Sequence, residues 1–166
     1  IVEYPTEEDL FLDWLKKGDC EAAMRQLDRH FQLIVESSDL LPNNEIHLPS
    51  QLKNEAESLN LGMILKDAYC DMILSNCFIV DGEPVFYDQE WCFDHLPAAF
   101  CMYRAINVVY TAYTWIDGVL PQSEVWKHFE IDEEKRNYFE KLQAVLFDDV
   151  QSRSICGRIG FLRQRD

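Results

Sequence analysis

Residues 69–91, YCDMILSNCFIVDGEPVFYDQEW, decide how this chain is interpreted. Two short β-prone runs, 77–80 and 85–87, flank the pair Asp81-Gly82. An Asp-Gly pair between such runs is a strong local signal for a β-hairpin. We therefore predict one hairpin in this stretch, and it is the only convincing β-structure that the sequence offers.

Helical patterns surround the predicted hairpin on both sides. Apolar residues recur every three or four positions, which is typical of helices with one buried face. Gly18-Asp19 divides the first such stretch into two helices, because Gly favours a helix end and Asp a helix start. Two helices are thus predicted within 7–35, and a third over 52–66. A further helix is predicted from Pro97 to about 117–118, and two more begin at Ser123 and at Asp132. The expected fold is mainly α with one β-hairpin, in a single domain covering 1–166.

Composition excludes several classes of function. The 166 residues include 15 basic and 30 acidic ones, and the net charge of -15 repels nucleic acids and anionic membranes. We find no signal peptide and no apolar run long enough for a transmembrane segment. The six cysteines lack any Cys-x-x-Cys pair, which favours reduced thiols in a cytoplasmic protein. The four histidines show no metal-ligand spacing and are interpreted as ordinary surface or core residues.

Oxygen-bearing side chains cluster around the hairpin. Asp71 precedes Asn76 by five positions, and the return strand leads to Asp88 and Glu90. In phosphoryl transfer one carboxylate accepts the proton of the attacking hydroxyl, while an amide oxygen and a carboxylate hold Mg²⁺. The pattern therefore predicts Asp71 as the catalytic base and Asn76, Asp88 and Glu90 as metal ligands. The alternative is that these Asp and Asn residues only form turns, which they favour anywhere.

The turn length decides whether two of these ligands share a face. With a two-residue turn at Asp81-Gly82, Asn76 lies opposite Tyr87 and on the other face from Asp88. A three-residue turn or a bulge places both on one face. We therefore predict an odd-length turn or a bulge, provided that both residues lie within the ladder.

The segment resembles the catalytic and metal-binding loops of the protein-kinase-like fold, in its small-molecule branch. There an Asp, four residues and an Asn are followed by a hairpin and a metal-binding Asp. Asp71, Asn76 and Asp88 match these three positions, and 88–91 is similar to the Asp-Phe-Glu form of choline kinase and aminoglycoside phosphotransferase relatives, in which Glu90 assists the metal. The resemblance implies the helical carboxy-terminal lobe of that fold, with Mg and ATP as cofactors.

The chain also departs from that family. Tyr69 stands where the family usually has His, and no glycine-rich phosphate loop or strand-borne lysine precedes the helices. The amino-terminal lobe of the fold is therefore expected to be absent. Because the chain opens with Ile1 and not Met, we expect a fragment of a longer protein.

Segments similar to 86–91 and 103–106 occur at the end of bacterial methyltransferase or glycosyltransferase proteins of surface-polysaccharide assembly. This resemblance implies an ATP- and Mg-dependent phosphotransferase-like lobe that acts on a small-molecule or sugar hydroxyl, with an upstream domain of the same chain as partner. Enzymatic activity is expected if the full-length protein supplies the missing lobe. The alternative is a noncatalytic, pseudokinase-like interaction module appended to the upstream enzyme. Arg104, in an apolar helix, is expected to pair with Asp88 or Glu90, or to reach the surface.

Overall fold

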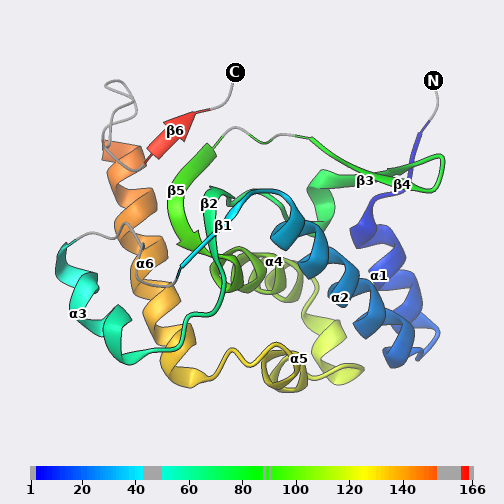
Figure 1. The fold of residues 1–166 in the computed structure, drawn as a ribbon. Coiled ribbons are helices and arrows are strands. Elements are labelled where there is room, and N and C mark those ends of the chain that lie inside the picture. Colours follow the sequence, from blue (N-terminus) through cyan, green and yellow to red (C-terminus); the bar gives the residue numbers. More distant parts are fainter. Residues whose placement is uncertain (1–2, 43–49, 88, 90, 153–161, 165–166) are drawn as a thin grey trace.

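The structure, a computed structural model, describes residues 3–42, 50–87, 89, 91–152 and 162–164. Figure 1 shows helices packed around a central helix, with one small sheet on the left and a separate hairpin at the upper right. Within the described residues there are six α-helices and two antiparallel sheets. The expectation of a mainly α fold is confirmed at this level.

The first two helices begin and end where the sequence predicts. α1 (Glu7–Lys16) starts with a capping box, in which Thr6 and Asp9 exchange side chain-to-backbone hydrogen bonds of 2.9 and 3.0 Å. α2 (Cys20–Glu36) starts at Asp19, whose carboxylate accepts from the Ala22 amide. Gly18 between them has a φ of 73°, a conformation that glycine adopts without steric cost. The predicted division at Gly18-Asp19 is confirmed.

The larger sheet was not predicted. Its strands are β1 (Leu40–Leu41), β2 (Ile64–Tyr69), β5 (Trp91–Pro97) and β6 (Leu162–Gln164), in the order β1-β2-β5-β6 and all antiparallel. The helix expected over 52–66 ends early, since α3 spans only Ser50–Ser58 and the chain enters β2 at Ile64. Short apolar runs do not distinguish a strand from a buried helix turn. The claim of one hairpin as the only β-structure is therefore wrong.

The predicted hairpin is present, but its turn differs from the prediction. β3 (Cys77–Val80) pairs with β4 (Glu83–Phe86), and Val80 opposes Glu83, which leaves a two-residue turn. Asp81 and Gly82 have φ values of 52° and 82°, the positive values that a tight type I′ turn requires. The turn therefore has two residues and not the odd number predicted. That prediction was made on the condition that Asn76 lies within the ladder, and the condition is not met, because Asn76 lies in a 3-10 turn just outside it.

Helices complete the carboxy-terminal half of the chain. α4 (Ala98–Ala112) follows Pro97 as predicted, but it gives way to a 3-10 segment, η3 (Thr114–Gly118), earlier than expected. α5 (Gln122–His128) and α6 (Glu133–Ser152) correspond to the two last predicted helices. α6 runs along the left side of the molecule beside α3 (Figure 1).

A continuous apolar core surrounds α4. Its aromatic part joins α4 to α5 and α6, where Tyr103 stacks on Trp126 and Phe100 meets Phe139 edge to face, each pair with ring centroids 5.7 Å apart. Such contacts hold the lower half of the molecule as one packed body. Among the described residues no helix is both long and apolar enough to cross a membrane.

Candidate functional site

The two sheets bring two connecting segments next to each other. Residues 70–76, here called the Asp71 loop, leave β2 and enter β3; residues 87–90 leave β4 and enter β5. At one end Tyr69 of β2 pairs with Cys92 of β5. At the other end the Tyr87 amide donates to the Asn76 carbonyl at 2.9 Å. The described ends of the two connections therefore lie next to each other, both at the larger sheet and at the hairpin.

Side chains hold the backbone of the Asp71 loop at consecutive carbonyls. Arg104 of α4 donates from Nε to the carbonyl of Cys70 at 3.0 Å. The Asp71 carbonyl accepts from Asn76 Nδ2 and from Gln89 Nε2, each at 3.0 Å. Gln89 thus ties the second segment directly to the peptide that follows Asp71. A loop that is held by groups from several elements keeps a defined geometry without belonging to a regular strand or helix.

The third carbonyl, that of Met72, is bound from α2. His30 Nε2 lies 2.7 Å from it, and His30 Nδ1 lies 2.6 Å from Glu7 Oε2 in α1. His30 is 0% and Glu7 2% exposed, so this pair is sealed from water. Four described elements or segments, α2, α4, η2 (Leu74–Asn76) and the segment containing Gln89, therefore fix the three carbonyls of residues 70–72.

Arg104 also places a positive charge beside the predicted base. Its Nη2 lies 3.6 Å from Asp71 Oδ1, and the two side chains are 15% and 23% exposed. Nη1 donates to Gln143 Oε1 at 3.0 Å, and the guanidinium sits 4.4 Å from the Phe147 ring centroid. The expected partners of Arg104 were Asp88 or Glu90, both of which lie outside the described residues. Among the described residues, Arg104 lies against Asp71 and the loop backbone.

The predicted metal ligands are described only in part. Asn76 is half-buried and commits its Nδ2 to Asp71, which leaves the amide oxygen as its remaining polar atom. An amide oxygen is a hard ligand of the kind that Mg²⁺ accepts. Asp88 and Glu90, the other two predicted ligands, lie outside the described residues. In the described part of the chain no three His, Cys, Asp or Glu side chains gather as a metal site.

The thiols at the two ends of the loop are not nucleophiles. Burial raises the pKa of Cys70 well above its ordinary value, and the neighbouring Cys101 thiol adds to this shift. Burial, followed by the charge of Glu7, raises the pKa of Cys77 to about 12. Only a thiolate reacts readily with electrophiles, so both groups stay protonated and inert at neutral pH. The chemistry of this site therefore belongs to its oxygen-bearing side chains.

An open cavity adjoins the hairpin at the start of the second segment. It has a volume of about 510 Å³ and is lined by Glu3, Tyr4, Thr6, Asp9, Phe78 and Tyr87. The residues before α1 form one wall, since the Ile79 amide donates to the Pro5 carbonyl at 2.8 Å. Tyr87 meets Phe78 edge to face with ring centroids 5.2 Å apart. The cavity thus offers aromatic surface next to the residues that precede Asp88 in sequence.

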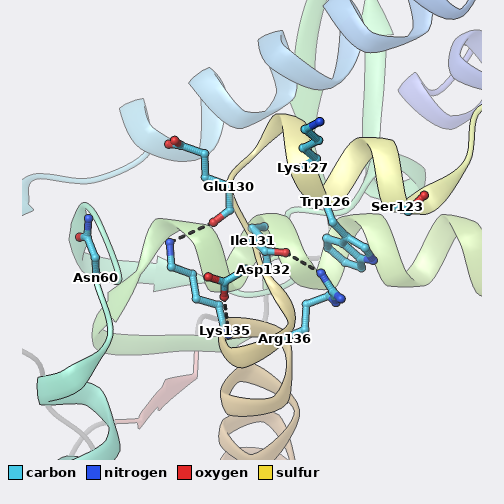
Figure 2. A pocket seen from close by; sticks show the side chains of 9 residues that line it. All are labelled: Asn60, Ser123, Trp126, Lys127, Glu130, Ile131, Asp132, Lys135 and Arg136. Atoms are coloured by element: carbon cyan, nitrogen blue, oxygen red, sulfur yellow. Dashed lines mark hydrogen bonds between the residues drawn. The ribbon is translucent and has the colours of Figure 1, made fainter.

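A second cavity, of about 550 Å³, lies where α5 leads into α6. Figure 2 shows Lys135 bonded to the Glu130 carbonyl and Arg136 bonded to the Ile131 carbonyl, at 2.9 and 2.8 Å. Arg136 also lies over the Trp126 ring, 5.6 Å from its centroid. These cations stabilise the chain between the two helices.

Comparison of the chain with protein-family profiles, with curated proteins and with solved structures finds no match. The geometry nevertheless adds residues that sequence reasoning missed. Glu7, His30 and Gln89 all act on the loop, yet each looks like an ordinary helix or loop residue in the sequence. Only their positions relative to a distant backbone reveal them. A histidine and a glutamate on the apolar faces of neighbouring helices are the one sequence signal that points to the pair.

Proposed function

We propose that this chain is the carboxy-terminal lobe of a protein-kinase-like phosphotransferase, which transfers phosphate from ATP to a small-molecule or sugar hydroxyl. The observation that carries the proposal is the Asp71 loop. A partly exposed carboxylate stands on a backbone whose successive carbonyls are all held by side chains. Rigid placement of a general base is what phosphoryl transfer asks of a protein, since the chemistry depends on positioning.

Asp71 takes the role of the base in this proposal. Its carboxylate accepts the proton of the substrate hydroxyl as that oxygen attacks the γ-phosphorus of ATP and the bond to the leaving ADP oxygen breaks. Arg104, 3.6 Å away, balances the charge of the carboxylate and holds the preceding peptide. Asn76 and Gln89 fix the carbonyl of Asp71 itself, so that the carboxylate keeps one orientation.

In this proposal the metal binds at the second segment, and the nucleotide binds in the cavity beside it. Asn76, Asp88 and Glu90 are the residues that would hold Mg²⁺, which neutralises the phosphate charge when it is bound. The cavity between Tyr4, Phe78 and Tyr87 supplies aromatic surface for the base of the nucleotide. An upstream domain of the full-length protein completes the nucleotide cleft in this proposal, because the chain itself contains no glycine-rich phosphate loop.

The test measures transfer from γ-labelled ATP, with Mg²⁺, by the full-length protein to a panel of monosaccharides and amino alcohols. We expect Asp71→Asn to lower the transfer rate by about 10²–10⁴ while nucleotide binding persists, because general base catalysis contributes that much. Asp94→Asn, a change of the same kind on β5, is the matched control and should leave the rate near that of the wild type.

Two results would contradict the proposal. Equal rates for the wild type and Asp71→Asn would remove Asp71 from the reaction. A lack of ATP binding by the full-length protein at any Mg²⁺ concentration would support the alternative, a noncatalytic module that packs against an upstream enzyme.

A further inference from the structure

The buried pair Glu7–His30 has a donor and acceptor pattern that fixes where protons lie. The Met72 carbonyl, 2.7 Å from His30 Nε2, has lone pairs and no hydrogen, so Nε2 must carry the proton of that bond. On the other side of the ring, Nδ1 lies 2.6 Å from a carboxyl oxygen of Glu7, and this bond needs a proton as well. The pair therefore contains one proton more than a neutral histidine beside a carboxylate.

The surroundings of Glu7 place that extra proton on the histidine. As a carboxylate, Glu7 accepts the bond from His30 Nδ1 at 2.6 Å. It is also the first residue of α1, where the helix dipole favours a negative charge.

The charge of His30 acts on the peptide next to the predicted base. Met72 follows Asp71 directly, and hydrogen bonds from a charged donor are stronger than those between neutral groups. Arg104 holds the carbonyl before Asp71 and His30 holds the carbonyl after it. The two cations, one from α4 and one from α2, therefore clamp the backbone on both sides of the carboxylate.

We propose that His30 is a positioning residue: held as an imidazolium by Glu7, it binds the carbonyl of Met72 and so fixes the orientation of the Asp71 carboxylate. The effect on the reaction rests on the proposed phosphotransferase function. The protonation of the ring does not, so the two can be tested separately.

The first test needs no activity. In full-length protein labelled with ¹⁵N at its histidine rings, we expect both ring nitrogens of His30 to carry protons at neutral pH. Glu7→Gln should leave only one of them protonated. Asp28→Asn is the matched control, because Asp28 pairs with the exposed His128 at the same 2.6 Å and should not change the His30 signals. A wild-type His30 ring with a single proton would overturn the proposal, whether or not the protein transfers phosphate.

The second test measures the reaction. In a phosphotransfer assay of the full-length protein, His30→Gln keeps one donor for the Met72 carbonyl but loses the charge. We expect kcat to fall about 10–100-fold with little change in the KM for ATP, since a small misplacement of a catalytic group is costly. His128→Gln should leave kcat unchanged. A His30→Gln protein with wild-type kcat would overturn the positioning role; absence of transfer by the wild type would instead refute the proposed function and leave the first test decisive for His30.

Discussion

Two regions of this molecule use side chains to hold backbone carbonyls, but over different distances along the chain. At the connection between α5 and α6, residues 129–132, Lys135 and Arg136 each reach back five residues to a carbonyl. In the Asp71 loop, Arg104 reaches a carbonyl 34 positions away and His30 one 42 positions away. The first arrangement is local to one stretch of sequence. The second exists only once α2, α4 and the two sheets have packed.

This difference explains which segments of the fold have a firmly fixed backbone geometry. A local cap forms with its helix and tolerates movement elsewhere in the molecule. A loop held from several elements has the geometry that those elements impose together, and each bond depends on the others. Residues that serve a reaction gain from the second arrangement, because it resists displacement by any single contact.

The largest effect is expected from replacing the two arginines one at a time. Arg104 and Arg136 are both half-buried, and each bonds to a carbonyl and lies over an aromatic ring. Arg104→Met should lower the free energy of unfolding by about 3 kcal/mol, since a carbonyl, the Gln143 amide oxygen and Asp71 lose a charged partner. Arg136→Met should cost about 1 kcal/mol, because only one such bond is lost. Denaturant unfolding measures both, and equal losses would remove the distinction between the two regions.

Alkaline pH should weaken the loop region through its thiols. The pKa of Cys77 is raised from 9.0 to about 12, so above pH 9 the unfolded chain loses this proton while the folded protein keeps it. The unfolded state then binds fewer protons, and stability falls as pH rises, by up to about 1.4 kcal/mol per pH unit for this thiol. The contribution of the Cys77 thiol to the free energy of unfolding is fully present below pH 9 and is lost towards pH 12.

Cys77→Val, which removes the titrating group, should therefore show a shallower decrease between pH 9 and 10 when unfolding is measured under reducing conditions. If the free energy of unfolding had the same slope against pH in the wild type and in Cys77→Val, this thiol would not ionise more easily on unfolding. The window stays below the ordinary tyrosine pKa of 10.0, because the buried Tyr110 and Tyr138 add losses of the same sign at higher pH.

The smallest expected effect tests whether a change in the hairpin turn leaves the Asp71 loop unaffected. Gly82 has a φ of 82° and space around its Cα, so Gly82→Ala introduces backbone strain without a clash and should cost about 1 kcal/mol. Gly118 has equal space and no positive φ, and Gly118→Ala should be close to neutral. Amide hydrogen exchange of residues 70–76 should not change in either variant. Faster exchange there in Gly82→Ala would show that the loop depends on the hairpin turn.

Much of the helical framework could be predicted because its signals are local. Thr6, Asp19 and Pro97 stand at helix starts, and Asp81-Gly82 adopts the turn that its residue types favour. The larger sheet could not be predicted. Its central strands β2 and β5 are separated in sequence by the loop and the hairpin, and their pairing depends on tertiary contacts that no window of sequence contains.

The residue types of the candidate site could be predicted from the sequence, but the contacts that hold these residues in place could not. Asp71 and Asn76 stand out by type and spacing, and the structure brings them together through the bond from Nδ2 to the Asp71 carbonyl. His30 was interpreted as an ordinary histidine because its role depends on the distant carbonyl of Met72. The turn prediction depended on Asn76 lying within the ladder, which ends at Cys77, and no local sequence signal shows where the ladder ends.

The side chains of His30, Asn76, Gln89 and Arg104 hold residues 70–72 through main-chain oxygen, an atom that every amino acid carries. At position 72 the side chain is buried, so its identity is restricted by the space available in the core. Any apolar residue of suitable volume should serve there, whereas the donors at positions 30, 76, 89 and 104 have few replacements. The recognisable signature of such a loop is thus largely dispersed over distant positions, and exchange of Met72 for another apolar residue can leave the shape of the loop unchanged.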